Sequence, residues 1–218
     1  PVLSGGYVGY EFDAMSTSLA ARKSCMEEIA PFLRQAWTGE PFQWQGKTIR
    51  VTPRPVQRPG PPIWMGGASK VAARRAARLA DVFLPADPEL FEAFNEELEK
   101  LGKEGNKLAR NEHIIWLSDD PDKFWSEFGP SALHENNAYG KWYSDWKAWN
   151  GYITTKDTEE LKGTGLYPVM TPEELVKHIE TAGDDPIIMF HPMAGGFDPE
   201  RSWSSLQLFE NKVIPLLN

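Results

Sequence analysis

The residues best suited to chemistry lie where a short apolar run ends in two glycines. Residues 63–65 (IWM) precede Gly66 and Gly67, and Ala68, Ser69 and an Ala/Arg-rich segment follow. This order predicts a strand, a glycine turn and the N-terminus of a helix. Free backbone N–H groups and the positive end of the helix dipole meet at such a junction, which suits a phosphate. Glycine also lets an anion approach the backbone closely.

The same residues also suit an ordinary connection between a strand and a helix. Gly and Ser are favoured in turns for their backbone geometry alone, and Ser69 is a good helix N-cap. Two adjacent glycines match no strict phosphate-binding fingerprint. The local pattern therefore leaves a phosphate site and a plain turn both open.

His191 is the second candidate, because it directly follows a predicted strand at residues 186–190. An imidazole at the carboxyl end of a strand could donate a proton to a substrate or hydrogen-bond it. The alternative is a loop histidine bonded to the backbone. The neighbouring residues His134 and Glu135 are expected to form a surface pair, and the alternative is that they line the pocket from the aromatic-rich segment. Scattered histidines and a single cysteine, Cys25, predict no metal site.

Apolar periodicity and capping residues predict an alternation of strands and helices along the chain. Strands are expected at residues 2–6, 63–65, 81–84, 113–117 and 186–190, with a hairpin at 42–51. Helices are expected at residues 17–37, 70–79, 88–103, 123–128, 171–181 and 202–217. An aromatic-rich segment at 131–149 has the spacing of a packed helix. Such alternation predicts an α/β fold with a parallel sheet.

Composition narrows the class of protein. The 218 residues are 41% hydrophobic, which is enough for a substantial core. Their net charge of −8 argues against nucleic acid as a partner, because binding to phosphates needs a basic surface. The one basic cluster, at Arg74, Arg75 and Arg78, is expected to be a solvated helix face. No apolar run is long enough for a membrane span, so no membrane partner is expected. A single cysteine fits a reducing, cytoplasmic location.

Several stretches resemble one family in the order in which that family has them. They are SGGYVGYEF (4–12), AWTGEPF (36–42), PRPVQRPGPPIWMGGAS (53–69), ARLADVFLP (77–85) and GGFDPERSWSSLQLF (195–209). The chain resembles the C-terminal two-thirds of bacterial luciferase-like flavin-dependent oxidoreductases. The similarity extends over nearly the whole sequence.

This resemblance implies a TIM-type (β/α)8 barrel that lacks its first three strands here. It implies one domain over residues 1–218, with excursions at about 40–60 and 121–170. The cofactor would be FMN, or alternatively the deazaflavin coenzyme F-420, with a reduced nicotinamide nucleotide as an electron source. By position, the cofactor-binding residues are Gly66, Gly67, Ala68 and Ser69 at the phosphate, and Gly5, Gly6 and Tyr7 on the neighbouring strand end.

The implied activity is that of a bacterial FMN-dependent monooxygenase that acts on a small organic substrate, with His191 as the candidate catalytic residue. Hydride transfer with the deazaflavin and a non-catalytic, truncated flavin-binding homologue are the alternatives. A different barrel enzyme that binds a phosphorylated metabolite also stays open. A homodimer or a separate flavin reductase is the expected protein partner. Gly67→Asp is expected to abolish cofactor binding by placing a carboxylate at the phosphate.

Overall fold

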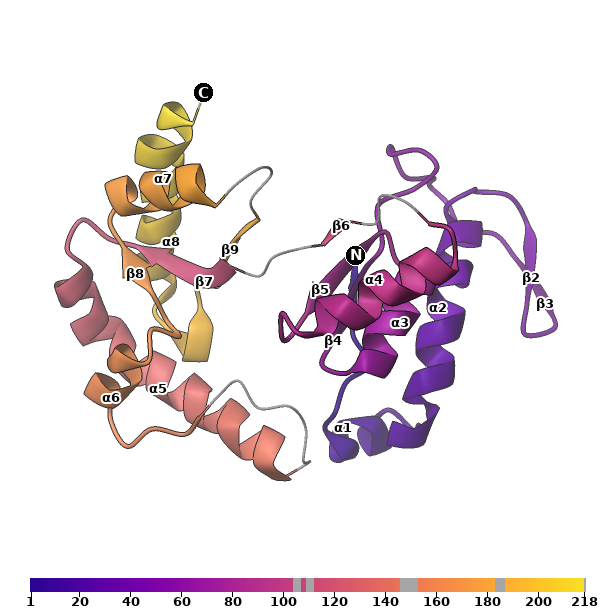
Figure 1. Ribbon diagram of the computed structural model, residues 1–218, viewed down its shortest axis with the longest axis horizontal. Coiled ribbons are helices and arrows are strands. Elements are labelled where there is room, and N and C mark those ends of the chain that lie inside the picture. Colours follow the sequence, from indigo (N-terminus) through magenta and orange to yellow (C-terminus); the bar gives the residue numbers. More distant parts are fainter. Residues whose placement is uncertain (104–106, 109–111, 146–152, 183–186, 218) are drawn as a thin grey trace. The chain divides into compact units, whose positions relative to one another are not determined.

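The computed structural model describes residues 1–103, 107–108, 112–145, 153–182 and 187–217 (Figure 1). The chain forms two compact units, Pro1–Ala109 and Arg110–Asn218. Each unit combines parallel strands with helices that pack on them, so the α/β prediction is confirmed. In the part of the chain that is described, no helix has the length and apolar character needed to cross a bilayer.

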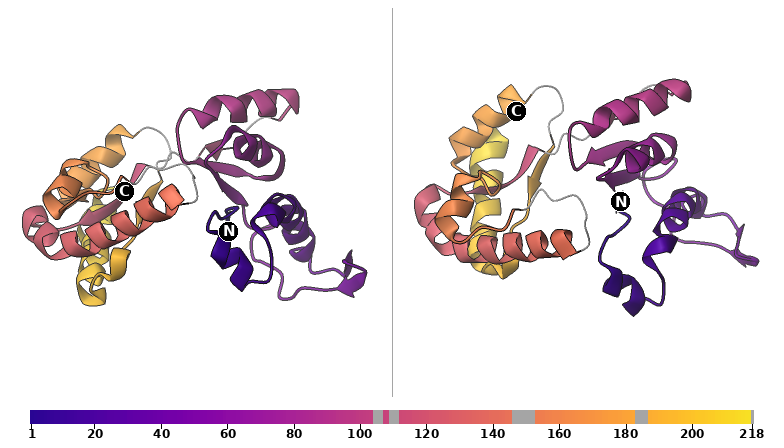
Figure 2. Two further views of the ribbon diagram at one scale, coloured as in Figure 1. Left: turned by 90° about the horizontal axis from the view of Figure 1, so that it is seen from below. Right: turned by 60° about the horizontal axis from the view of Figure 1, so that its bottom comes forward.

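The first unit is built on a parallel sheet with the strand order β1-β4-β5-β6. The β2–β3 hairpin is antiparallel and projects away from this sheet in both views of Figure 2. It turns at Gln45 and Gly46, as predicted. The elements in order are β1 (Val2–Leu3), α1 (Gly9–Ala14), η1 (Leu19–Ala21), α2 (Arg22–Ala36), β2 (Phe42–Trp44), β3 (Lys47–Ile49), β4 (Trp64–Gly67), α3 (Lys70–Leu79), β5 (Val82–Pro85), α4 (Leu90–Lys100) and β6 (Lys107–Leu108).

One hydrophobic core holds β4 and β5 against α2, α3 and α4. The buried face of α3 consists of the small residues Ala73, Ala76 and Ala77, which let this helix approach the strands closely. Beside it, the rings of Phe83 on β5 and Phe94 on α4 stack with centroids 5.1 Å apart. The sheet end that carries the glycine pair is thus held by well-packed elements.

The positive charge of the arginines on α3 is offset by glutamates of neighbouring helices. Arg74 pairs with Glu96 of α4 at 3.6 Å, and Arg78 pairs with Glu97 at 3.1 Å. Arg75 lies 3.9 Å from Glu27 of α2. These partly exposed ion pairs contribute little stability individually, but they offset the positive charge that the sequence concentrates on this helix.

The second unit contains a three-stranded parallel sheet in which β7 lies between β8 and β9. Its buried strand residues Ile115, Trp116 and Leu117 contact two hydrophobic cores, one with α5 and one with α7 and η3. The elements in order are β7 (Glu112–Leu117), α5 (Pro121–Asp145), α6 (Thr158–Gly163), β8 (Val169–Met170), α7 (Pro172–Thr181), β9 (Ile188–Phe190), η2 (Ala194–Gly196), α8 (Pro199–Leu208), the π-helical turn η3 (Phe209–Val213) and η4 (Ile214–Leu216).

Helix α5 is much longer than the predicted helix at 123–128, because it continues through Gly129 and Pro130 into the aromatic segment. A proline inside a helix removes one backbone hydrogen bond. The buried side chains of Trp125, Phe128 and Ala132 lie on both sides of that position and favour a continuous helix. Residues 146–149 of the predicted aromatic segment lie outside the described residues. The single domain over residues 1–218 stays a prediction.

Ser205 on α8 fixes the end of β7, and its removal should be costly. Its buried Oγ accepts a hydrogen bond from the Leu117 N–H at 2.7 Å. Ser205→Ala leaves that N–H without a partner, so we expect the free energy of unfolding to fall by about 1–3 kcal/mol. The hydroxyl of the exposed neighbour Ser204 donates to the Arg201 carbonyl of its own helix, and Ser204→Ala should cost less than about 0.5 kcal/mol. Urea denaturation measures both; equal losses would contradict this role.

Candidate functional site

A glycine turn after β1 and the glycine-containing end of β4 lie side by side in the first unit. Strands β1 and β4 run parallel, with Leu3 opposite Met65, so the residues that follow each strand meet at the same edge of the sheet. A Cβ atom on Gly66 would lie 4.0 Å from the Cβ atom of Ser4. The structure therefore brings together the two predicted groups, Gly5, Gly6 and Tyr7 with Gly66, Gly67, Ala68 and Ser69. We call these seven residues the glycine site.

The structure corrects the predicted position of the glycine pair, which belongs to strand β4 and not to the turn after it. Strand β4 does not end at Met65 but runs through Gly67, which pairs with Pro85 of β5 and accepts the Ala86 N–H at 2.8 Å. The turn itself is Ala68 and Ser69. Strand β5 supplies the partners of both glycines, Leu84 and Pro85, so the two glycines extend the ladder.

The two glycines face opposite sides of the sheet, because side-chain directions alternate along a strand. A Cβ atom on Gly67 would lie 2.6 Å from Ala72 Cβ and 3.3 Å from the Phe83 ring. Substitution of Gly67 therefore disturbs the packing of α3, and Gly67→Asp does not test phosphate binding alone. A Cβ atom on Gly66 would meet nothing closer than 3.9 Å, so it would fit there in ordinary contact with its neighbours.

The N-terminus of α3 presents free donors at the turn. Ser69 caps the helix as predicted, since its Oγ accepts the Ala72 N–H at 3.2 Å. In the described part of the chain, the N–H groups of Lys70 and Val71 have no partner, as expected in the first turn of a helix. The exposed Lys70 side chain begins at the same place and adds a positive charge. The sequence already carried this signal, because a lysine directly follows the capping serine.

The turn after β1 needs glycine at one position and carries a second cation. Gly6 has φ +64°, and a Cβ atom there would lie 3.0 Å from the Phe12 ring. The Gly6 carbonyl accepts a hydrogen bond from the Arg22 guanidinium at 3.3 Å. Arg22 is the first residue of α2 and is exposed. Its contact with this turn joins residues 16 apart, which the sequence pattern did not predict.

His191 lies in the second unit, one residue beyond β9, and its side chain is 43% exposed. Its Nδ1 atom is 3.7 Å from Oε1 of Glu135 on α5. The expected surface pair is wrong for Glu135, because only 11% of that side chain is exposed and it accepts hydrogen bonds from Tyr167 and Gly195. The sequence does not predict the partners of this carboxylate, since they are 32 and 60 residues away.

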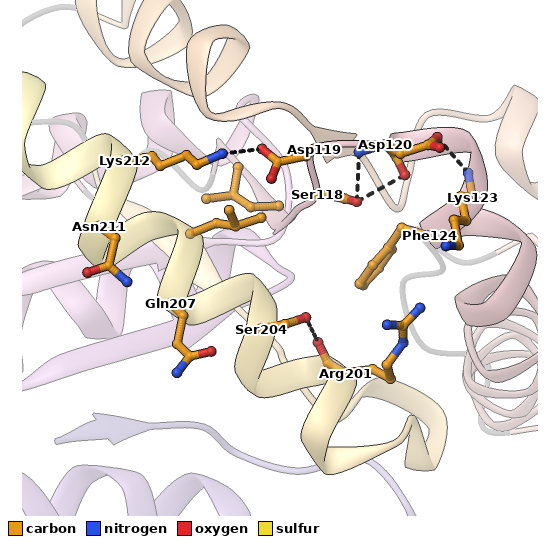
Figure 3. Close-up of a pocket in the computed structure, with 12 residues that line it drawn as sticks. Ser118, Asp119, Asp120, Lys123, Phe124, Arg201, Ser204, Gln207, Asn211 and Lys212 are labelled. Carbon is orange, nitrogen blue, oxygen red and sulfur yellow. Dashed lines mark hydrogen bonds and ion pairs between the residues drawn. The ribbon is translucent and has the colours of Figure 1, made fainter.

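A groove of about 460 Å³ lies between the β7–α5 turn and the α8–η3 segment (Figure 3). Its cations are largely neutralised: Lys212 pairs with Asp119 at 2.7 Å, and Arg201 is bonded to Glu127. The hydrogen bond with Glu127 raises the pKa of the Arg201 guanidinium. None of the predicted site residues lines this groove, so it lends no support to phosphate binding there. Within the described residues, no cluster of potential metal ligands occurs.

Comparison with known proteins identifies the family. A family model described as luciferase-like monooxygenase matches residues 5–183. The chain belongs to this family. The match contains the glycine site and ends before His191, and it confirms the resemblance carried by the sequence motifs.

Individual relatives of the luciferase-like family show how far the similarity extends. Over 60 residues the chain is 37% identical to the FMNH2-dependent dimethylsulfone monooxygenase of Pseudomonas putida. The aligned stretch covers 25% of this chain and 16% of that enzyme. A monooxygenase from Streptomyces bottropensis superposes with a TM-score of 0.61 at 17% identity, covering 100% of this chain and 68% of that one. An F-420-dependent secondary alcohol dehydrogenase gives 0.60 at 18% identity, with 100% and 69% covered. The structural likenesses show a shared fold.

Proposed function

We propose that this chain belongs to a flavin-dependent oxidoreductase of the monooxygenase type and that its glycine site holds the 5′-phosphate of FMN. The proposal rests on the adjacency of the glycine turn after β1 and the glycine-containing end of β4, beside the N-terminus of α3 with its unpartnered N–H groups. The unpartnered N–H groups of Lys70 and Val71 would donate to the phosphate oxygens.

The barrel is part of the same proposal. Strands β1, β4, β5, β7 and β9 would be the last five strands of a TIM-type (β/α)8 barrel, with the β2–β3 hairpin and the α5–α6 region as excursions. The superposed Streptomyces enzyme supports this, since the chain covers 68% of its length. Active sites of such barrels lie at the carboxyl ends of the strands, which is where the glycine site and His191 occur within their own units.

FMN is our first choice of cofactor, and coenzyme F-420 is the alternative. The names of the relatives support either one, because one enzyme is FMNH2-dependent and another is F-420-dependent. When bound, FMNH2 would supply electrons for oxygen activation, whereas F-420 would accept a hydride in its oxidised form or supply one in its reduced form. A reduced nicotinamide nucleotide would serve as the electron source, through this protein or a separate flavin reductase.

The remaining contributions come from the protein side chains. Lys70 and Arg22 would offset phosphate charge near the two turns, and His191 would exchange a proton with a small organic substrate at the end of β9. We also propose a cytoplasmic, bacterial protein that acts as a homodimer or with a flavin reductase.

Fluorescence titration of the full protein with FMN and, separately, with F-420 tests this function. We expect one of them to bind at micromolar concentration or better and, if that cofactor is FMN, we expect substrate oxidation to depend on a reduced nicotinamide nucleotide. Oxygen dependence would select the monooxygenase, and oxygen-independent hydride transfer would select the F-420 enzyme. Binding without turnover would favour a non-catalytic homologue, and binding of neither cofactor would contradict the proposal.

A further inference from the structure

Three segments of the second unit meet at the carboxylate of Glu135. Its Oε2 atom accepts a hydrogen bond from the Gly195 N–H at 2.8 Å. Its Oε1 atom accepts a hydrogen bond from the Tyr167 hydroxyl at 3.3 Å and lies 3.7 Å from His191 Nδ1. The side chain is only 11% exposed, so these groups replace water around a charged carboxylate.

The loop that carries the histidine is held firmly on α5. Gly195 has φ +58°, and a Cβ atom on it would lie 2.0 Å from the Ser131 carbonyl oxygen, so the loop backbone touches the helix directly. The buried Ser202 hydroxyl donates to the Pro192 carbonyl and ties the start of α8 to the same loop. The loop contacts therefore keep the backbone of His191 close to α5, with Nδ1 of the imidazole 3.7 Å from the Glu135 carboxylate.

This geometry distinguishes the two nitrogens of the imidazole. A lone pair on Nδ1 would face the carboxylate and be repelled, whereas an Nδ1–H group would be attracted. We propose that Glu135 is a positioning residue that holds His191 with its proton on Nδ1 and so leaves Nε2 free to accept a proton from the substrate. This step rests on the proposed function, in which His191 exchanges a proton. In the described part of the chain, Glu135 is the charged partner of His191 within ion-pair distance.

A purely structural role for Glu135 makes a different prediction. If the carboxylate served only to accept the Gly195 N–H, then Glu135→Gln would preserve its role, because the amide retains an acceptor oxygen. The charge, by contrast, is lost in that variant. The glutamine variant thus separates the two interpretations.

Nuclear magnetic resonance of protein with 15N-labelled histidine measures the tautomer directly, at a pH where the imidazole is neutral. His191→Gln assigns the signal. In the native protein we expect the Nδ1–H form to predominate, and in Glu135→Gln we expect the ratio of Nδ1–H to Nε2–H to fall about threefold or more. Tyr167→Phe removes a hydroxyl but keeps the carboxylate, so it should keep the native preference.

Two results would overturn the inference: a predominantly Nε2–H imidazole in the native protein, or an unchanged ratio in a folded Glu135→Gln variant. The first remains decisive if the glutamine variant does not fold. No cofactor is needed for this measurement. A failure to bind FMN would therefore contradict the proposed function without touching the tautomer result, and the reverse also holds.

Discussion

Replacement of Gly66 by aspartate should weaken FMN binding about tenfold to a hundredfold while leaving the fold intact. The Cβ atom of the new side chain would fit without a clash, because the nearest atoms to it are 3.9 Å away. Its carboxylate would then lie near the phosphate and repel it. Fluorescence titration with FMN measures the affinity, and circular dichroism confirms folding.

The matched control is Gly66→Ala, which adds the Cβ atom without the charge. We expect its FMN affinity to stay within about threefold of the native value, because the space for one methyl group exists. Equal affinity for FMN in the aspartate variant and the native protein would contradict the placement of the phosphate. Gly67 cannot serve for this comparison, since any Cβ there meets Ala72.

Gly195→Ala should lower the free energy of unfolding by at least about 3 kcal/mol. A methyl group at this position would overlap the Ser131 carbonyl oxygen, which is a backbone atom of α5 and cannot turn aside. The residue also has a positive φ, which disfavours alanine. The loop would have to lift from α5 and would lose the hydrogen bond to Glu135.

Gly196 provides the control for backbone conformation alone. It has φ +78°, and a Cβ atom on it would meet nothing within 4 Å. Gly196→Ala should therefore cost only about 1–2 kcal/mol, the penalty of the left-handed conformation. Urea denaturation of both variants decides the matter. Similar losses would show that contact with Ser131 contributes nothing beyond backbone strain.

The parts of the fold that depend on residues close together in the sequence were predictable from it. Helix α3 begins and ends where the Ser69 cap and the alanine spacing place it. The capping box at Thr171 and Glu174 likewise sets the start of α7. Local hydrogen bonds and spacing decide these positions. The end of β4 was missed, because the pairing of Gly67 with Pro85 depends on a neighbouring strand.

The candidate site divides in the same way. The residues of the glycine site could be predicted because they belong to short contiguous motifs whose order matches the family. The contacts of Glu135 could not be predicted, since its carboxylate accepts a hydrogen bond from a loop 60 residues further along the chain. The continuation of α5 past Pro130 was hidden for a related reason, because the buried aromatic residues outweigh the local effect of the proline.

A comparison of FMN with riboflavin tests whether the glycine site binds a phosphate, since the two molecules differ only in the 5′-phosphate. If the N–H groups at the start of α3 bind that phosphate, FMN should bind the native protein about a hundredfold more tightly than riboflavin, equivalent to two charge-assisted hydrogen bonds. Gly66→Asp should remove most of this difference while leaving riboflavin affinity nearly unchanged. Equal affinities of the native protein for FMN and riboflavin would contradict the account.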